Sequence, residues 1–273
     1  MLFREKAETA CIRVTLWYPT PMECPRAVLF DLDDTLAESF KSPAKEMIEA
    51  LHKLLEKMPV AIITGAGLQR MNNQFLPAFA NSPYIDRLFV FPSSSAQLFL
   101  NINKEWNEVY NLFLTDEERT KIKAAIAEVI NENTDLQNVP HYGQQLFDRE
   151  AQVAYTLVGV EASSDFKKNW DKDNSLRQRM IDELKKKIPE FEILMGGSTT
   201  VDVTRKGINK SYGVKWLSER LKIDPKEMLY IGDALFEGGN DYVVIPTGVR
   251  TMQTSGPDET FRLIGSILAS CTA

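Results

Sequence analysis

The sequence predicts an α/β protein in which a parallel sheet forms the core and an α+β layer is inserted into it. Near the start, RAVLF (26–30) and VAIIT (60–64) are short apolar runs typical of buried strands. The segment 42–58 between them has apolar residues at a helical period. Strand, helix and strand at this spacing form a βαβ unit, which requires a parallel sheet. Helical patterns at 209–221 and 258–270 indicate that the end of the chain belongs to the same domain.

The elements of this core follow from local signals. Pro43 after Ser42 is typical of a helix start, so the first helix is expected within 42–58. MLYIGD (228–233) predicts a late buried strand, and DYVVIPTG (241–248) predicts a further strand region. We therefore assign residues 24–96 and 204–273 to the core and residues 1–23 to an N-terminal extension.

The middle of the chain, residues 97–203, has a different order of elements. Thr115 and Glu118 form a capping box, which predicts that a helix begins there. Runs of strand and helix in this order indicate a separate α+β layer, the cap, inserted into the core. Its expected helices are 115–133 and 175–188, and its expected strands are 97–101, 106–114, 152–160, 191–195 and 199–204.

Composition favours a small-molecule partner. The 273 residues include 38 acidic and 32 basic side chains and no long Lys/Arg block, so neither a nucleic acid nor an anionic membrane is indicated. No apolar run is long enough to span a bilayer, and the start of the chain lacks the apolar region of a signal peptide. The three cysteines, Cys11, Cys24 and Cys271, lie far apart without metal-like spacing, which fits a reducing compartment. We expect a cytoplasmic protein whose oligomeric state is open.

The stretch AVLFDLDDTL (27–36) ends a buried strand in acidic residues. Ligands bind to open α/β sheets outside the carboxyl ends of the strands, and Asp31 and Asp33 lie at such an end, two residues apart. Without a partner their like charges would repel, and their pKa values would rise. A divalent cation removes this repulsion, and ligands that are all oxygen favour Mg²⁺.

Three further polar residues stand at equivalent places in the pattern. Thr64 ends the strand VAIIT, Asp233 ends LYIG, and Lys210 lies at the start of the helix 209–221. If the sheet is parallel, these positions meet at one edge. A nucleophilic carboxylate, a second carboxylate that moves a proton, a metal ion, a hydroxyl and an ammonium group together predict a phosphoryl-transfer site.

At this point the sequence resembles a known superfamily. DLDDT (31–35), IITG (62–65), Lys210 and GDALFEGGND (232–241) are similar to the four ordered motifs of the haloacid dehalogenase superfamily of phosphatases and phosphomutases. The resemblance implies a Rossmann-like core. It also implies that Asp31 forms an aspartyl-phosphate and that Asp33 protonates the leaving group and then activates water. Further implied roles are Mg²⁺ binding by Asp31, the main-chain carbonyl of Asp33 and Asp233, phosphate binding by Thr64 and Lys210, and indirect support of the metal by Asn240 and Asp241.

The position of the insertion, between the second and third motifs, resembles that in superfamily members with a large α+β cap, of subfamily IIB (cap type C2B). These include sugar-phosphate phosphatases and the eukaryotic-type phosphomannomutases. Similarity to the mutases extends over most of residues 26–270 and implies that the cap contacts the substrate through Arg149, Lys167, Thr200 and Asp202.

The sequence departs from the mutase pattern at two cationic positions. Val160 stands where the mutases have a second cap arginine, and Phe40 stands where they have a core arginine. A mutase must hold a bisphosphate by either end, so these losses weaken mutase chemistry more than hydrolysis. Two further departures are Asp34 in place of a common glycine, and TGAG (64–67), which lacks a frequent following arginine.

Three functions remain as hypotheses. We favour a Mg²⁺-dependent phosphatase acting on a small phosphorylated metabolite, with a sugar phosphate as the expected substrate. The first alternative is a phosphomannomutase-like mutase that also uses an aspartyl-phosphate. The second is a binding protein without catalysis on the same fold, against which the presence of both Asp31 and Asp33 counts.

Overall fold

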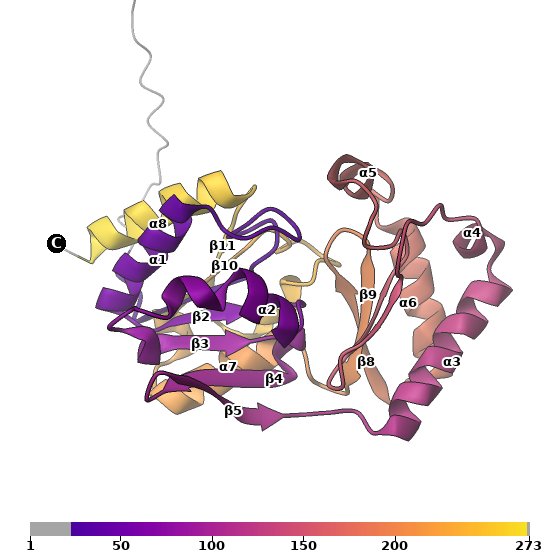
Figure 1. Cartoon of the computed structure of the whole chain (residues 1–273), viewed down its shortest axis with the longest axis horizontal. Coiled ribbons are helices and arrows are strands. Elements are labelled where there is room, and N and C mark those ends of the chain that lie inside the picture. Colours follow the sequence, from indigo (N-terminus) through magenta and orange to yellow (C-terminus); the bar gives the residue numbers. More distant parts are fainter. Residues whose placement is uncertain (1–22, 272–273) are drawn as a thin grey trace, which may run out of the picture.

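The structure, a computed structural model, describes residues 23–271. The predicted N-terminal extension, except for Glu23, lies outside the described residues, as does Cys11. Two β-sheets with their helices lie side by side, the larger one formed from both ends of the chain and the smaller one from its middle (Figure 1). The predicted α/β core with an inserted α+β cap is therefore confirmed.

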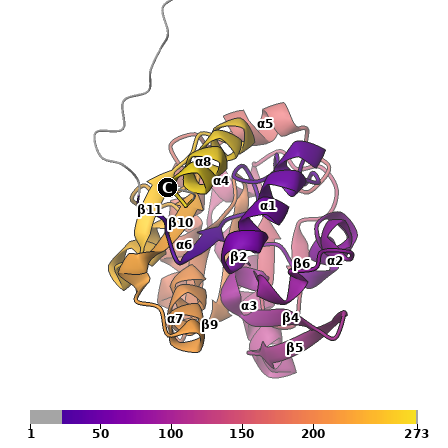
Figure 2. The same ribbon diagram turned by 90° about the vertical axis from the view of Figure 1, so that its left-hand side faces the viewer.

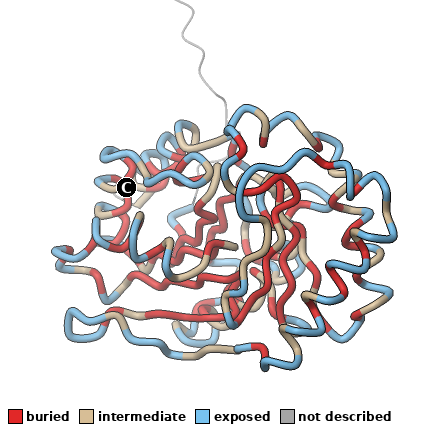
Figure 3. The backbone as a smooth tube through the Cα atoms, turned by 45° about the vertical axis from the view of Figure 1, so that its right-hand side comes forward, coloured by how far each residue is buried: buried red, intermediate tan, exposed pale blue. Residues whose placement is uncertain are grey.

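The core is a seven-stranded sheet in the order β11-β10-β1-β2-β3-β4-β5. The pairs from β11 to β3 are parallel, and the last two pairs are antiparallel. Burial of the apolar strands explains this arrangement, since all residues of β1, β2, β3 and β10 are buried (Figure 3). The strands are β1 (Ala27–Phe30), β2 (Val60–Ile63), β3 (Leu88–Phe91), β4 (Gln97–Ile102), β5 (Glu105–Asn111), β10 (Met228–Gly232) and β11 (Arg250–Gln253).

Helices cover both faces of this sheet (Figure 2). Helices α1 (Lys45–Lys57), α2 (Leu68–Gln74) and α8 (Pro257–Ser270) pack on one face, where they share a buried apolar cluster with alternate residues of β1 and β2. Helix α7 (Lys210–Leu221) packs on the other face. This doubly covered sheet leaves the carboxyl ends of the parallel strands free to form a site.

Residues 97–111 lie in the core sheet, and not in the inserted layer to which we had assigned them. Strand β4 pairs antiparallel with β3, and β5 pairs antiparallel with β4. A short hairpin suffices to join antiparallel strands, so the chain extends the core sheet by two strands before it enters the cap. Strand-like composition alone did not indicate which sheet these strands would join.

The strand region expected at 241–248 is wrong. Residues Tyr242–Thr247 form a 3₁₀ helix, and the following strand is β11. The 3₁₀ helix begins after Asp241, whose carboxylate is bonded within the core, and ends at Gly248, which has φ 84°. The apolar residues of this segment pack against α7 instead of forming a ladder, as buried Val244 shows.

The cap is a four-stranded antiparallel sheet in the order β6-β7-β9-β8, and α3 and α6 cover the face that points away from the core (Figure 1). The predicted capping box is present. Thr115 Oγ1 accepts a hydrogen bond from Glu118 N, and Glu118 Oε2 accepts one from Thr115 N. The elements are α3 (Asp116–Glu132), α4 (Thr134–Gln137), β6 (Leu146–Asp148), β7 (Val153–Thr156), α5 (Ser164–Asn169), α6 (Ser175–Lys187), β8 (Phe191–Gly196) and β9 (Thr200–Arg205).

A disulfide joins Cys24, just before β1, to Cys271, just after α8. The two residues are 247 positions apart in the sequence, and their Cα atoms lie 4.9 Å apart. Disulfides are rare in reducing compartments. This bond therefore counts against the compartment that the cysteine spacing had indicated. In the described part of the chain, no helix has both the length and the apolar character needed to cross a membrane.

Candidate active site

Three of the predicted site residues follow directly on parallel strands of the core. Asp31 comes after β1 and Asp233 after β10, two strands that lie next to each other. The main-chain N–H of Asp31 donates to Ile231 O at 3.0 Å, which fixes the two strand ends together. Thr64 follows β2, and its N–H donates to Phe91 O at 3.0 Å. The edge of the sheet therefore brings these residues together, as the sequence predicts.

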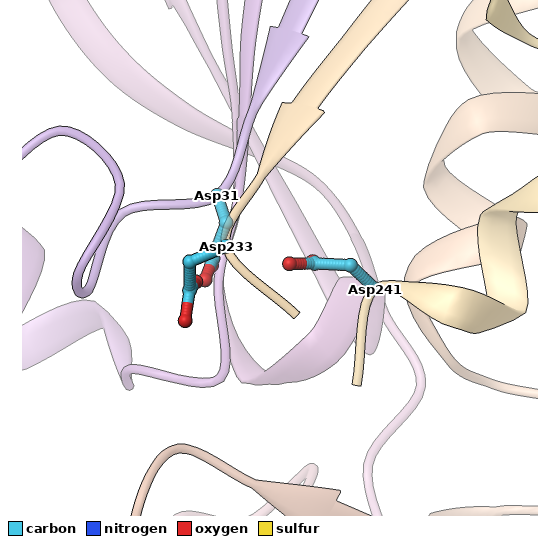
Figure 4. A group of neighbouring side chains, drawn as sticks. All are labelled: Asp31, Asp233 and Asp241. Carbon is cyan, nitrogen blue, oxygen red and sulfur yellow. The ribbon is translucent and has the colours of Figure 1, made fainter. Parts of the chain in front are cut away.

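Asp31, Asp233 and Asp241 form a compact acidic cluster. One carboxylate oxygen from each lies within 4.8 Å of the others. Figure 4 shows Asp31 and Asp233 side by side at the strand ends, with Asp241 pointing toward them from the start of the 3₁₀ helix Tyr242–Thr247. Asp31 and Asp241 are buried. We refer to these three residues as the acidic cluster.

Lys210 is the cation within the acidic cluster. Its Nζ lies 2.8 Å from Asp31 Oδ1 and 2.7 Å from Asp241 Oδ1, and the residue is only 2% exposed. It is the first residue of α7, where the Asn209 side chain caps the helix by accepting a hydrogen bond from Ser211 N. Burial alone would lower the pKa of Lys210, but the charges of Asp241 and Asp31 raise it above its usual value. The ammonium group is therefore charged.

Asp241 occupies a more central place than the resemblance implied. Its Oδ1 accepts hydrogen bonds from Lys210 and from the Tyr230 hydroxyl at 2.5 Å, and its Oδ2 accepts one from Ala234 N at 3.0 Å. The sequence suggested indirect support of a metal ion, whereas the structure places this carboxylate in the acidic cluster itself. The role of Tyr230 was not predicted, because a buried tyrosine in a strand is most simply read as core.

Burial and mutual repulsion raise the proton affinity of the acidic cluster. Burial raises the pKa of Asp31 well above its usual value against the attraction of Lys210, and the charges of Asp241 and Asp233 add to the rise. Burial raises the pKa of Asp233 to about 7, again with a contribution from Asp241. One ammonium group therefore does not compensate three carboxylates, and the cluster has the charge and the oxygen donors to take a divalent cation.

Thr64 and Asn240 line the same cavity as Asp31 and Asp233. Thr64 is 1% exposed, and its Oγ1 accepts a hydrogen bond from Ala66 N at 3.0 Å. That bond leaves the hydroxyl proton available to a bound oxygen. Within residues 23–271, Asn240 Oδ1 is buried and has no hydrogen-bond partner. A buried amide oxygen without a partner is expected to have a ligand or a water molecule there.

Asp33 lies apart from the acidic cluster and is bound to an arginine that the sequence analysis missed. Both of its carboxylate oxygens contact the guanidinium group of Arg70, at 2.5 and 2.6 Å. Arg70 lies on α2, six positions after Thr64, whereas the expected arginine would have followed the glycine of the second motif directly. The sequence signal that could have identified Arg70 is its place in the first turn of the helix that follows TGAG.

The cap closes over these residues and forms a cavity of about 530 Å³ with them. Arg149 reaches the core, where its Nη1 donates to Gly65 O at 2.8 Å and also to Gln152 Oε1 at 2.9 Å. Lys167 is 7% exposed and donates to Val160 O at 2.7 Å, with its Nζ 4.3 Å from the centre of the Phe40 ring. The predicted cap residues therefore lie at the boundary between cap and core.

Thr200 and Asp202 enter the cavity from β9. Asp202 is 3% exposed, and its Oδ1 has no partner among the described residues. Burial raises the pKa of Asp202 to about 6, against the attraction of Arg149 and Lys210. All four cap residues line the cavity, but their contact with a substrate stays a prediction.

Several solved structures share the fold of this chain. An IMP-nucleotidase of Plasmodium falciparum, bound to IMP, superposes with a TM-score of 0.70 at 18% identity and covers 90% of this chain and 68% of that protein. The C-terminal domain of Candida albicans trehalose-6-phosphate phosphatase gives 0.63 at 15% identity, with 90% and 93% covered. A capped Rossmann-like core with these motif residues at its strand ends defines a member of the haloacid dehalogenase superfamily.

Sequence comparison places the chain within that superfamily. The sequence model of the family described as eukaryotic phosphomannomutase matches residues 47–270. A phosphomannomutase of Saccharomyces cerevisiae is 26% identical over 245 residues, which are 87% of this chain and 92% of that protein. A phosphomannomutase of Dendrobium officinale is 25% identical over 239 residues, which are 85% and 90%. The chain belongs to the eukaryotic phosphomannomutase family.

Proposed function

We propose that this protein is a Mg²⁺-dependent phosphatase that hydrolyses a small phosphorylated metabolite, a sugar phosphate, through an aspartyl-phosphate on Asp31. The observation that carries the proposal is the acidic cluster with Lys210, of which Asp31 and Asp233 line a cavity closed by the cap. The cavity suits a small organic phosphate in size and is lined by polar groups from both parts of the chain.

The donor set of the site fits Mg²⁺. The acidic cluster provides closely spaced oxygen atoms, and Asn240 Oδ1 is buried without a partner in the described chain. Asp31, Asp233 and the main-chain carbonyl of Asp33 would hold the ion, and Asp241 and Asn240 would support it. When bound, Mg²⁺ would neutralise the carboxylates and stabilise charge on the phosphoryl oxygens.

The protein residues account for both half-reactions. An oxygen of Asp31 attacks phosphorus and forms the acyl phosphate while the bond from phosphorus to the leaving oxygen breaks. Asp33 gives its proton to that oxygen. It then takes a proton from a water molecule that attacks the phosphorylated Asp31, which releases inorganic phosphate and restores the carboxylate. Lys210 and Thr64 hold the phosphoryl oxygens during both steps.

Hydrolysis fits the cap surface better than a mutase reaction. Phe40 occupies the place of a core arginine, and the centre of its ring lies 5.1 Å from the Arg70 guanidinium and 4.3 Å from the Lys167 ammonium. Arg149 already donates to Gly65 O and Gln152. These contacts engage the cationic groups nearest Phe40, so a second phosphate would have to rely on the exposed lysines of the cavity rim, Lys168 and Lys172.

A phosphomannomutase-like mutase remains the second candidate. Two observations support it: the family to which the chain belongs, and the lack of a carboxylate partner for the Lys167 ammonium group among the described residues. In the described part of the chain the Lys167 ammonium group is buried, donates to Val160 O and pairs with no carboxylate. Such a cation could accept a second anionic group of a substrate.

The two reactions give different products, and one assay separates them. The purified protein with Mg²⁺ is incubated with a panel of sugar phosphates, and separately with mannose 1-phosphate and a catalytic amount of the 1,6-bisphosphate. Release of inorganic phosphate as the main product supports the phosphatase. Interconversion of the 1- and 6-phosphates faster than phosphate release would establish the mutase instead.

The variant Asp31→Asn tests the nucleophile. We expect turnover to fall on the order of 10⁴-fold or more, because the amide cannot form the acyl phosphate. Mass spectrometry after an acid quench should show a phosphorylated protein for the wild type and none for the variant. Asp258→Asn, at an exposed position on α8, is the matched control and should keep wild-type activity. Substantial turnover by Asp31→Asn would contradict the assignment.

A further inference from the structure

The predicted proton donor, Asp33, is held by a two-point ion pair. Arg70 Nη1 lies 2.5 Å from Asp33 Oδ2, and Arg70 Nη2 lies 2.6 Å from Asp33 Oδ1. The side chains are 15% and 22% exposed, so the pair lies mostly out of solvent. A guanidinium group that meets a carboxylate through two parallel bonds fixes the direction of the carboxylate as well as its distance.

The orientation of Arg70 is itself determined by its surroundings. Its Nε donates to Gln74 Oε1 at 2.9 Å, one turn further along α2. Its guanidinium group also lies 5.1 Å from the centre of the Phe40 ring. Helix α2 is anchored to the core through Met71, which is fully buried. The guanidinium plane of Arg70 is therefore positioned by α2, through Gln74, and by the Phe40 ring.

The contacts of Asp33 restrict how it can meet a substrate. Oδ1 accepts a second hydrogen bond, from Phe40 N at 3.0 Å. An ionised carboxylate has about four acceptor positions. Arg70 and Phe40 N use one position on Oδ2 and two on Oδ1, so the remaining position lies on Oδ2. Asp33 lines the cavity together with Asp31 and Thr64. The ion pair thus leaves Oδ2 as the carboxylate oxygen with a free acceptor position.

We propose that Arg70 is a positioning residue for Asp33, which holds the carboxylate where a proton can pass between Oδ2 and the leaving oxygen or the attacking water. In this proposal Arg70 acts through Asp33 and does not contact the phosphoryl group. The inference rests on the proposed function, since it assigns Arg70 to the protonation step of that reaction. The competing role is direct phosphate binding by Arg70, which would affect every substrate alike.

The dependence of the rate on the leaving group distinguishes the two roles. p-Nitrophenyl phosphate has a leaving group that departs without protonation, whereas an alkyl phosphate requires a proton donor. For Arg70→Ala we expect single-turnover cleavage of the alkyl ester to fall about 100-fold. The burst of p-nitrophenolate should fall less than about 5-fold, since it needs no general acid. Equal losses for the two esters would overturn the proposal.

Three further measurements test whether Arg70 acts through Asp33. In the Asp33→Asn background, Arg70→Ala should cause no further loss with the alkyl ester, and a further tenfold loss would overturn the proposal. Added guanidinium ion should partly restore alkyl-ester cleavage by Arg70→Ala. Arg70→Lys, which keeps the charge without the two-point contact, should fall between the wild type and Arg70→Ala.

Thermal unfolding tests the contact without any turnover. The shifts in Tm caused by Arg70→Ala and Asp33→Asn should be non-additive in the double variant, because each single change leaves the other group unpaired. Arg87→Ala is the matched control, since Arg87 donates to Leu55 O and Glu56 O elsewhere in the core, and its shift should add to that of Asp33→Asn. If the Tm shifts of Arg70→Ala and Asp33→Asn were additive while the wild type is active, the role of Arg70 would be overturned and the proposed function would stand. A wild type that cleaves none of the esters would overturn the proposed function as well.

Discussion

Asp202 is a carboxylate that folding buries without full compensation. It is 3% exposed, and the nearest cationic groups that act on it are Arg149 and Lys210. Burial outweighs their attraction and raises the pKa of Asp202 to about 6, from a usual value of 3.8. The folded protein therefore binds more protons than the unfolded chain between about pH 4 and pH 6, so this group makes the free energy of unfolding fall as pH rises through that range.

The variant Asp202→Asn should consequently be more stable than the wild type at neutral pH. A difference of about two pKa units corresponds to about 3 kcal/mol at pH 8, and it should vanish below about pH 4, where Asp202 is protonated in both states. Urea denaturation at several pH values measures this. Asp258→Asn, at an exposed position, should show no comparable trend. A variant that is less stable than the wild type at pH 8 would show that Arg149 stabilises the ionised form.

Asp34 illustrates what a single residue can and cannot reveal from sequence. It stands where the superfamily commonly has glycine, and its φ of 55° lies in the left-handed region that favours glycine. Aspartate tolerates this region, and here Ser39 N and Ser39 Oγ donate to its carboxylate at 3.2 and 2.6 Å. The sequence shows the departure, whereas the compensating contacts depend on the fold of the loop.

Helix α7 packs closely against the core at Gly213. Because Lys210 lies on the same helix, this close packing sets the position of Lys210. A Cβ atom added at Gly213 would lie 2.6 Å from Ser95 Oγ and 3.0 Å from Ile63 Cδ1. Lys210 lies one turn earlier on the same helix. A glycine in a helix interior costs about 1 kcal/mol relative to alanine, and close packing is the physical reason for its presence here.

The change Gly213→Ala should therefore lower stability and weaken the site, in spite of the better helix propensity of alanine. We expect a loss of about 1–3 kcal/mol, because α7 or its neighbours must shift, and a lower kcat as Lys210 moves with the helix. Gly265→Ala on α8 is the control, since nothing lies within 4 Å of its added Cβ atom, and it should gain up to about 1 kcal/mol. Equal effects of the two changes would contradict this account of the packing.

Among the elements, those with strong periodic patterns were predictable. The expected helices 42–58, 115–133, 175–188, 209–221 and 258–270 correspond to α1, α3, α6, α7 and α8. The sequence analysis did not identify β3, which is one more buried apolar run, or the short helices α2 and α5. The 3₁₀ segment Tyr242–Thr247 was misassigned because its apolar residues pack on a helix, a tertiary effect that local pattern does not contain.

At the scale of the whole molecule, the convergence of the motif residues was predictable from one premise. Since the strands are parallel, residues that follow them meet at one edge, which places Asp31, Thr64 and Asp233 together. The pairing of Asp33 with Arg70 and the disulfide could not be predicted in this way. The ion pair depends on how α2 packs on the sheet, and the disulfide depends on where the end of α8 lies relative to the start of β1.

The disulfide should contribute strongly to the stability of the folded protein. It closes a loop with a sequence separation of 247, and the loss of chain entropy in the unfolded state predicts a contribution of about 3–5 kcal/mol. The midpoint of urea unfolding should fall when the protein is reduced, and Cys24→Ser with Cys271→Ser should reproduce the effect. Activity under native conditions should persist, because the disulfide lies at the opposite end of β1 from Asp31. Identical midpoints with and without reductant would contradict this prediction.

The same bond changes the topology of the polypeptide. Between Cys24 and Cys271 the backbone and the sulfur bridge together form a closed circle, and the cap is an excursion of that circle away from the core sheet. A break in the backbone anywhere along this circle opens it but releases no fragment. The two segments that build the catalytic edge, one from each end of the chain, thus stay tethered to each other even when the peptide connection through the cap is severed.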